Sequence, residues 1–478
     1  MSYTSLRFML FVALALLLYR LCRARYRAAV LLVLSYIFYC TWSVHAAVWL
    51  AGATLFTFVG ARLAANPQTS EHKSAEHRNW LFAVLVVLLT GYLFFFKLAA
   101  IAAVPGVERI ALPLGLSYYT FKLISYVLDC YWGKIEPETR IVSFASYVAF
   151  FPQLMGGPIQ RAESYLAQLP PIRLSIGEGL PRIVWGLFKK IAVADQLGLT
   201  VNYVYANVRS LHGAQLLAGF LLFPLQLYAD FSGLTDIAIG LGLLFGIRGP
   251  ENFNRPFTAS TITDFWRRWH MTLTGWLGDY VFTPLRMATR NAGTASVVFS
   301  ITVNTVAIGL WHGFTWGYFA FGLVHSAYLV TEALTSKVRA RFFRKNPRLD
   351  DWGSRLGSVM VFFLATIGFV FFRAAKVTDA AWGLVHVWDG LSRFSADLGV
   401  LIRAVSLRPL VIGLIGFACI EVGERFRPDA WIKGSYSRWP DWAQEMFGAT
   451  TMTLLVAAVY LLLMANPGQD RPFIYEVF

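Results

Sequence analysis

Long apolar segments recur along the whole chain, and they set the main limit on what it can fold into. A membrane-spanning helix needs about 20 mostly apolar residues. Segments that approach this length are 6–21, 28–42, 46–64, 80–99, 180–200, 214–229, 234–247, 295–311, 316–335, 355–372, 408–423 and 449–465. These runs are too continuous for the alternating strands of a membrane β-barrel. The pattern predicts an all-α polytopic membrane protein with about 11–13 transmembrane helices.

The charged residues agree with this class and indicate an orientation. Only 14% of the residues are charged, whereas a soluble domain carries about 25%. The net charge of +15 comes from short basic loops between apolar runs, which is the pattern of cytoplasmic loops. Because no basic domain stands apart from the apolar runs, the charge does not indicate nucleic-acid binding. Arginines at 20, 23, 25 and 27 follow the first run, which places the N-terminus outside. The most basic segment, 337–348, is also expected in the cytoplasm.

The central third of the chain differs from its flanks. The segments 112–121, 150–159 and 230–264 are rich in Pro, Gly and aromatic residues. Irregular backbone at membrane depth persists only where protein or a water-filled cavity surrounds it. We therefore expect re-entrant helices around a cavity, within a single membrane-embedded domain over 1–478. Its catalytic core would lie at about 111–335, and its scaffold helices at about 1–110 and 350–478.

His312 lies in an apolar segment, in the stretch Gly309-Leu310-Trp311-His312-Gly313. An ionisable residue at membrane depth is costly and is by default a functional candidate. The alternative is a packed histidine bonded to neighbouring backbone. Glycines recur here at 309, 313 and 317. This spacing either lets another helix approach closely or leaves room for a slender ligand such as an acyl chain.

A second candidate is His270, which ends the cluster Asp264-Phe265-Trp266-Arg267-Arg268-Trp269-His270. On a helix, Asp264 can pair with Arg268, and Trp266 with His270, because each pair is four residues apart. Arg267 would point toward a cytoplasmic interface or a phosphate. The alternative is an interfacial helix whose tryptophans and arginines contact lipid headgroups.

Two carboxylates, Asp230 and Asp236, interrupt another apolar segment. They are candidates for orienting a histidine or an arginine, or for lining a wet passage. Ser232 is not in the G-x-S-x-G setting of a serine hydrolase. The chain also has no metal-ligand spacing, P-loop or dinucleotide fingerprint, so no metal or tightly bound cofactor is expected.

Several motifs together resemble the membrane-bound O-acyltransferase family. The match is closest to the bacterial branch that includes alginate O-acetyltransferase and the membrane protein of teichoic-acid D-alanylation. The motifs that carry the resemblance lie in one order over nearly the whole chain, at 112–121, 151–159, 230–233, 251–257, 264–270 and 309–313. The resemblance implies a helical fold with a central funnel or tunnel, and catalytic roles for His312 and His270.

The resemblance also implies a reaction. An acetyl group would pass from cytoplasmic acetyl-CoA, or another acyl thioester, across the bacterial inner membrane. It would O-acetylate an exported polysaccharide such as alginate, through a periplasmic protein that accepts or transfers the group. Candidate residues for binding substrate or donor are Arg267, Arg268, Trp266, Trp311, Asp230, Asp236 and Asn254.

Other functions are compatible with the same residues. The acceptor could be peptidoglycan or cellulose, or the acyl group could be D-alanine from a carrier protein. Embedded His and Asp residues also suit a transporter or proton-coupled channel for an acyl or sugar carrier. A non-catalytic scaffold for an envelope complex is the third class.

Overall fold

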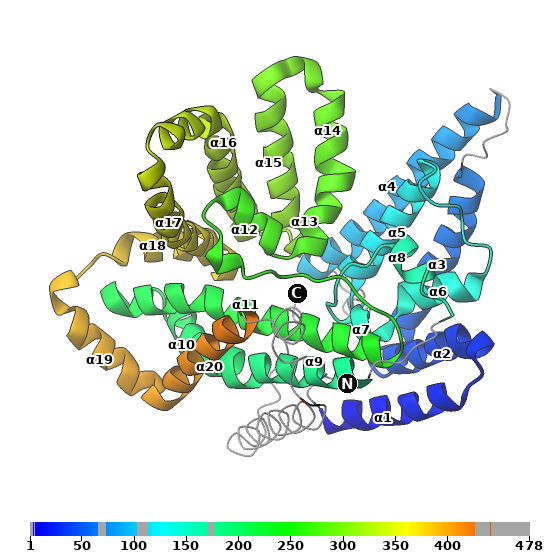
Figure 1. Ribbon diagram of the computed structural model, residues 1–478, viewed down its shortest axis with the longest axis horizontal. Helices are drawn as coiled ribbons and strands as arrows, with labels where there is room; N and C mark the ends of the chain where they lie inside the picture. The colour runs from blue at the N-terminus through cyan, green and yellow to red at the C-terminus, as the bar shows by residue number, and fades with distance from the viewer. Residues whose placement is uncertain are drawn as a thin grey trace. The chain divides into compact units, whose positions relative to one another are not determined.

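The computed structural model describes residues 5–65, 73–102, 113–170 and 176–425, together with Tyr3 and Pro440. All regular elements in these ranges are helical, which confirms the predicted all-α class (Figure 1). The described chain forms two compact units. The first contains residues up to Ile183 and Thr235–Glu251, and the second contains Val184–Leu234 and the residues from Asn252 onward. Each unit is described by itself.

The first unit is built mainly from the N-terminal helices. They are α1 (Leu6–Leu21), α2 (Arg27–Cys40), α3 (Val44–Ala64), α4 (Lys73–Ala102), α5 (Leu116–Tyr131), α6 (Ile141–Ala149), α7 (Phe151–Leu154) and α8 (Ala162–Leu166), after which α9 (Ile176–Phe188) begins. Within this unit, α3 packs against α4, α5 and α6, and α2 packs against α6. The helix α5 is buried along almost its whole length, so it forms part of the unit's core.

The second unit contains the predicted site. Its longer helices are α10 (Asp195–Ala206), most of α11 (Gly213–Leu244), α15 (Gly293–His312), α16 (Trp316–Lys345), α17 (Pro347–Arg373), α18 (Val377–His386), α19 (Phe394–Val405) and α20 (Leu407–Arg425). Its shorter elements are a π-helix at Lys189–Ala194, α12 (Ile262–Arg268), α13 (Met271–Leu277), a π-helix at Gly278–Phe282 and α14 (Thr283–Ala288). Figure 1 shows α14, α15, α16 and α17 side by side in this unit, and α15 contacts α16, which contacts α17.

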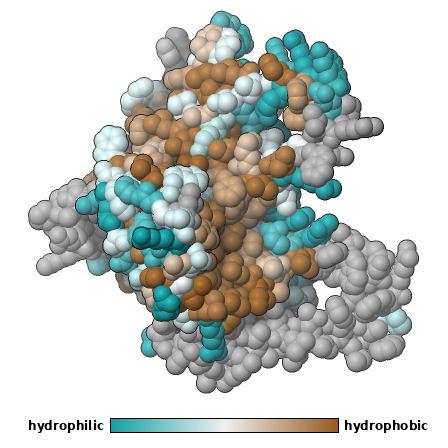
Figure 2. Space-filling model, turned by 90° about the vertical axis from the view of Figure 1, so that its left-hand side faces the viewer, coloured by the Kyte–Doolittle hydropathy of each residue, from teal (hydrophilic) through white to brown (hydrophobic). Residues whose placement is uncertain are grey.

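Five of the helices in the described ranges are long and apolar enough to cross a membrane. They are Val44–Ala64, Arg78–Ala99, Gly213–Leu244, Arg290–His312 and Arg355–Arg373, and the bent pair α19 and α20 would add a sixth. On α17, exposed large apolar residues recur at helical spacing, at Leu356, Val359, Met360, Phe363 and Ile367. Such a stripe fits contact with lipid, and Figure 2 shows broad hydrophobic patches on the face it displays.

The expectation that 214–229 and 234–247 are two spans was wrong, because 214–229 and 234–244 belong to the single helix α11, which ends at Leu244. Asp230 and Asp236 suggested a break between them. In the structure each carboxylate has a basic partner, so neither interrupts the helix. The expected spans 6–21, 28–42 and 408–423 coincide closely with α1, α2 and α20, 316–335 lies within α16, and 449–465 lies outside the described residues. The number of spans therefore stays a prediction.

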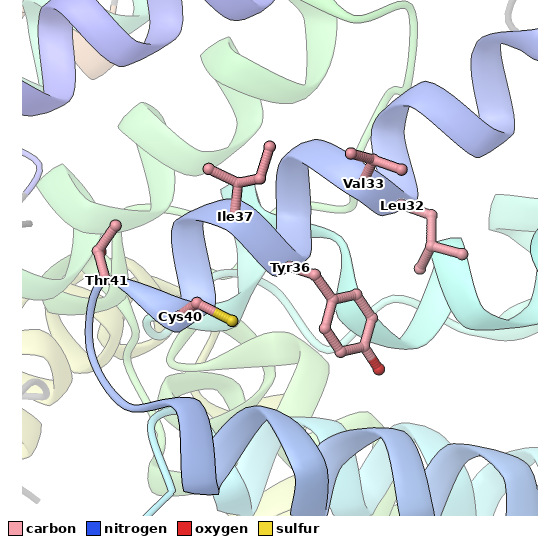
Figure 3. Close-up of a pocket in the computed structure, with 6 residues that line it drawn as sticks. All are labelled: Leu32, Val33, Tyr36, Ile37, Cys40 and Thr41. Carbon is pink, nitrogen blue, oxygen red and sulfur yellow. The ribbon is translucent and has the colours of Figure 1, made fainter.

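A shallow apolar groove lies on α2, in the first unit. Figure 3 shows its lining residues, Leu32, Val33, Tyr36, Ile37, Cys40 and Thr41. They all belong to one helix and its C-cap, and none is charged. The groove contains no predicted site residue.

Candidate functional site

The two predicted histidines lie on either side of one tryptophan in the second unit. The ring centroid of Trp311 is 5.7 Å from that of His270 and 4.8 Å from that of His312. All three side chains are buried, with 1% of His270, 6% of Trp311 and 8% of His312 exposed. Two segments more than 40 positions apart in the sequence therefore bring their side chains together. This arrangement is expected of a functional site, and not of two separate contacts with lipid headgroups.

His312 is the last residue of α15, and aromatic rings enclose it. Phe372 packs edge-on to His312 at 4.8 Å between centroids, and Tyr318 lies 6.0 Å away. Tyr318 belongs to α16, which begins after the turn Gly313–Thr315, and Phe372 is near the end of α17. The ends of three adjacent helices therefore position this imidazole.

The glycines around His312 serve helix packing. A side chain at Gly309 would meet the backbone carbonyl of Tyr318, and one at Gly317 would meet the carbonyl of Phe371 at 2.7 Å. The first of the two readings, close approach of helices, is the one observed. The alternative, a slot for a slender ligand, is not formed at Gly309 and Gly317, because neighbouring backbone occupies the space there, while Gly313 lies against the ring of Tyr318.

His270 occupies a strained turn between α12 and α13. Its backbone is left-handed (φ 44°, ψ 52°), a conformation uncommon for any residue with a side chain. Strain of this kind persists where the surroundings impose it, often at functional sites. The buried side chain of Asn252 holds the turn, because its Oδ1 accepts hydrogen bonds from the Thr272 hydroxyl at 2.6 Å and the Thr272 amide at 3.3 Å.

Burial determines the charge state of His270. Desolvation lowers the pKa of its imidazole from 6.5 to about 3, although a backbone hydrogen bond raises it slightly. Phe231 of α11 packs edge-on to the ring at 4.6 Å. The side chain is therefore neutral near pH 7, and a neutral imidazole can donate one hydrogen bond without carrying charge.

Trp266 contacts a different histidine from the one expected. The helix α12 ends at Arg268, so the four-residue spacing does not carry Trp266 onto His270, and that expected pair was wrong. Instead the Trp266 indole Nε1 donates to Nδ1 of His325 at 3.3 Å. His325 is fully buried, and Gly368 makes room for it, since a side chain there would strike its ring.

The polar residues of the 264–270 cluster divide into paired and exposed groups. The predicted Asp264–Arg268 pair is confirmed, with 2.9 Å between Oδ2 and Nε. The side chain of Arg267 is exposed. Asn254 is also exposed, and its backbone amide donates to the Arg268 carbonyl. Arg267 thus projects away from the buried rings, where it is accessible to a ligand.

Asp230 is paired with a lysine of the neighbouring π-helix. Its Oδ1 lies 2.9 Å from Nζ of Lys190, which also lies 3.0 Å from Asp195. Both Asp230 and Lys190 are almost fully buried. The next residue along α11 is Phe231, which contacts His270, so the ion pair lies one residue from that contact.

Asp236 belongs to the first unit and has other partners. The Arg182 guanidinium binds Asp236 at 2.7 Å and Glu251 at 2.6 Å. This three-membered network joins α9, the end of α11 and the loop after it. Its geometry is that of a structural clamp.

The sequence thus singled out the two histidines, Trp311 and the arginines as candidates, but not the residues that support them. Asn252 lies within the motif at 251–257, yet only the fold reveals its contact with the turn. Lys190 could have been identified from the sequence, because it is one of two adjacent lysines in an apolar segment. Among the described residues, no cluster of His, Cys, Asp or Glu is arranged to hold a metal ion.

Several known proteins are similar in sequence to this chain. The model of the membrane-bound O-acyltransferase family matches residues 138–374, which include both histidines. The probable alginate O-acetylase of Azotobacter vinelandii is 36% identical over 78% of this chain and 74% of its own length. That of Pseudomonas putida is 32% identical over 98% of each. The peptidoglycan O-acetyltransferase of Helicobacter pylori is 30% identical over 73% of this chain and 71% of its own.

Proposed function

We propose a donor, an acceptor and residue roles for this chain, which belongs to the membrane-bound O-acyltransferase family and is an acyltransferase. The chain moves an acetyl group from acetyl-CoA to a hydroxyl of an exported polysaccharide such as alginate. A periplasmic protein that accepts or passes on the group takes part. The single observation that carries the site assignment is the buried pair His270 and His312 against Trp311.

In this mechanism His312 is the general base. It removes the proton from the acceptor hydroxyl as that oxygen attacks the thioester carbonyl, a role that contributes about 10²–10⁴-fold in rate. A carbon–oxygen bond forms, the carbon–sulfur bond breaks, and the thiolate leaves with the proton. His270, neutral in its buried turn, donates a hydrogen bond to the oxyanion that develops.

The helix directions support an acceptor on the outer side. The basic end of α16, with Arg344 and Lys345 in its last turn, is opposite the end that joins α15. Basic ends favour the cytoplasm. His312, at the other end of the α15–α16 hairpin, then faces the periplasmic half of the inner membrane, in keeping with an N-terminus outside.

The names of the relatives support the acceptor class. Two are probable alginate O-acetylases, and one is a peptidoglycan O-acetyltransferase. All three act on envelope or exported polymers by name, so an extracellular polysaccharide is the shared class. The alternative to acetyl-CoA as the donor is a carrier protein that delivers D-alanine.

The decisive experiment compares two histidine variants in membranes that contain the full chain. His312→Ala should lower acetyl transfer from labelled acetyl-CoA to polysaccharide by at least about 100-fold, with normal protein levels. His212→Ala replaces an exposed histidine of the same unit and should leave transfer unchanged. Normal acetyl transfer by His312→Ala would show that His312 is not the general base. Labelling from a charged carrier protein, but not from acetyl-CoA, would select the alternative donor.

A further inference from the structure

The short helix α12 leads directly into the His270 turn, and a carboxylate from α16 holds its first turn (Figure 1). One oxygen of Glu332 accepts hydrogen bonds from the backbone amides of Ile262 at 2.8 Å and Thr263 at 3.3 Å. The first amides of a helix have no partner within that helix, and a carboxylate there also interacts favourably with the helix dipole. Because α12 has only 7 residues, too few to be stable alone, its position depends on such contacts.

The hydrogen bond from Trp266 to His325 attaches α12 to the same face of α16. His325 and Glu332 are two helical turns apart on α16, so their side chains project from one face. Nδ1 of His325 can accept from the indole only when it carries no proton, so the proton of the neutral ring is on Nε2. Within the described ranges, this buried Nε2 has no hydrogen-bond partner. A buried donor without a partner is unfavourable, so packing alone does not account for a histidine here.

The chain between α12 and α13 transmits the position of α12 to His270. On one side of His270, the Arg268 carbonyl accepts a hydrogen bond from the Asn254 amide at 3.0 Å. On the other side, the Met271 amide donates to the Asn252 carbonyl at 2.8 Å. The left-handed turn is therefore fixed at both ends, and a shift of α12 would also move His270.

We propose that His325 and Glu332 are positioning residues, which hold α12 so that His270 keeps its place relative to His312. The proposal rests on the proposed function, in which His270 donates to the developing oxyanion. The first turn of α16 also carries Tyr318, whose ring centroid lies 6.0 Å from that of His312. A single helix thus supports both imidazoles, directly through Tyr318 and indirectly through α12.

The kinetic test uses the acetyl-transfer assay in membranes that contain the full chain. His325→Leu removes the acceptor but keeps an apolar side chain. It should lower kcat by about 10- to 100-fold with little change in KM for acetyl-CoA, because removal of an oxyanion donor costs about 10²–10³-fold. His325→Asn provides an amide oxygen near the position of Nδ1 and should retain most of the parent kcat.

A double variant separates positioning from a general effect on folding. In a His270→Ala background, His325→Leu should lower kcat little further, because a positioning residue acts only through the residue that it holds. A residue that matters only for folding would lower kcat by the same factor in both backgrounds. Such an equal loss would overturn the proposal.

Hydrogen exchange of the backbone amides, with the full chain in lipid nanodiscs, tests the attachment without any activity. His325→Leu and Glu332→Ala should each speed exchange within 262–274 by about 3- to 10-fold, as expected for loss of a hydrogen bond that holds this segment. Ser326→Ala is the matched control. Ser326 is also buried on α16, but its hydroxyl bonds to Thr302 of α15 at 2.8 Å, so exchange within 262–274 should stay as in the parent protein.

Unchanged exchange within 262–274 in both His325→Leu and Glu332→Ala would also overturn the proposal. If His325→Leu does not accumulate, Trp266→Phe removes the same hydrogen bond from the other side and replaces it in both tests. Failure of the proposed function gives a different result, which is a normal kcat in His270→Ala itself. The exchange data alone then decide whether the two α16 residues hold the turn.

Discussion

The contact between α15 and α16 offers a direct test of how the site is held. Gly322 of α16 lies against the backbone of α15, and an alanine Cβ there would be 2.8 Å from both the Thr305 carbonyl oxygen and the Val306 Cα. Real Cβ contacts are almost never below 3.0 Å, and most exceed 3.4 Å. Gly322→Ala therefore requires the two helices to separate by about 0.5 Å, and such overpacking costs about 1–3 kcal/mol.

Separation of these helices also moves the turn that carries His312. A misplacement of about 1 Å in a catalytic group can cost 100-fold in rate, so we expect Gly322→Ala to lower acyl transfer by up to about that factor. The free energy of unfolding is measured by SDS titration in mixed micelles, and transfer is measured in membranes. Both quantities should fall together.

Gly91→Ala is the matched control for this experiment. Gly91 lies in the membrane-length part of α4, and a Cβ there would meet nothing within 4 Å. Alanine is the better helix former by about 0.5–1 kcal/mol, so this variant should be slightly stabilised and fully active. If Gly322→Ala were as stable and active as Gly91→Ala, the close helix contact would not be what positions His312.

The sequence allowed prediction of the helical class and of both histidines because each depends on a local signal. Long apolar runs identify membrane helices, and an ionisable residue within such a run stands out regardless of its partners. The Asp264–Arg268 pair was also predictable, since both residues lie within one short helix. The role of His270 needed the family resemblance, because its spacing alone favoured a helix that anchors at lipid headgroups.

Features that depend on distant partners were not predictable. Asp230 and Asp236 looked like a break in the chain, but Lys190 and Arg182 neutralise them from other helices, and α11 continues through both. The same reason explains the wrong pairing of Trp266, whose partner His325 is 59 positions away. The sequence shows that a polar group in an apolar segment is costly to bury. Only the fold shows which hydrogen-bond or charge partner offsets that cost.

Two further predictions concern buried charge. Lys190→Met leaves Asp230 buried without its partner and should lower the free energy of unfolding by about 3–5 kcal/mol; adding Asp230→Asn should restore part of the loss, and no recovery in SDS titration would contradict the pairing. For His270, the folded pKa of about 3 lies below the unfolded value of 6.5, so protonation favours unfolding. Its contribution to stability is therefore complete above about pH 6.5 and is lost progressively as the pH falls from there toward 3, by about 2 kcal/mol at pH 5. His270→Gln should show a smaller loss of stability than the parent protein between pH 7 and pH 5, and an equal loss in both would mean that this imidazole is not buried in its neutral form.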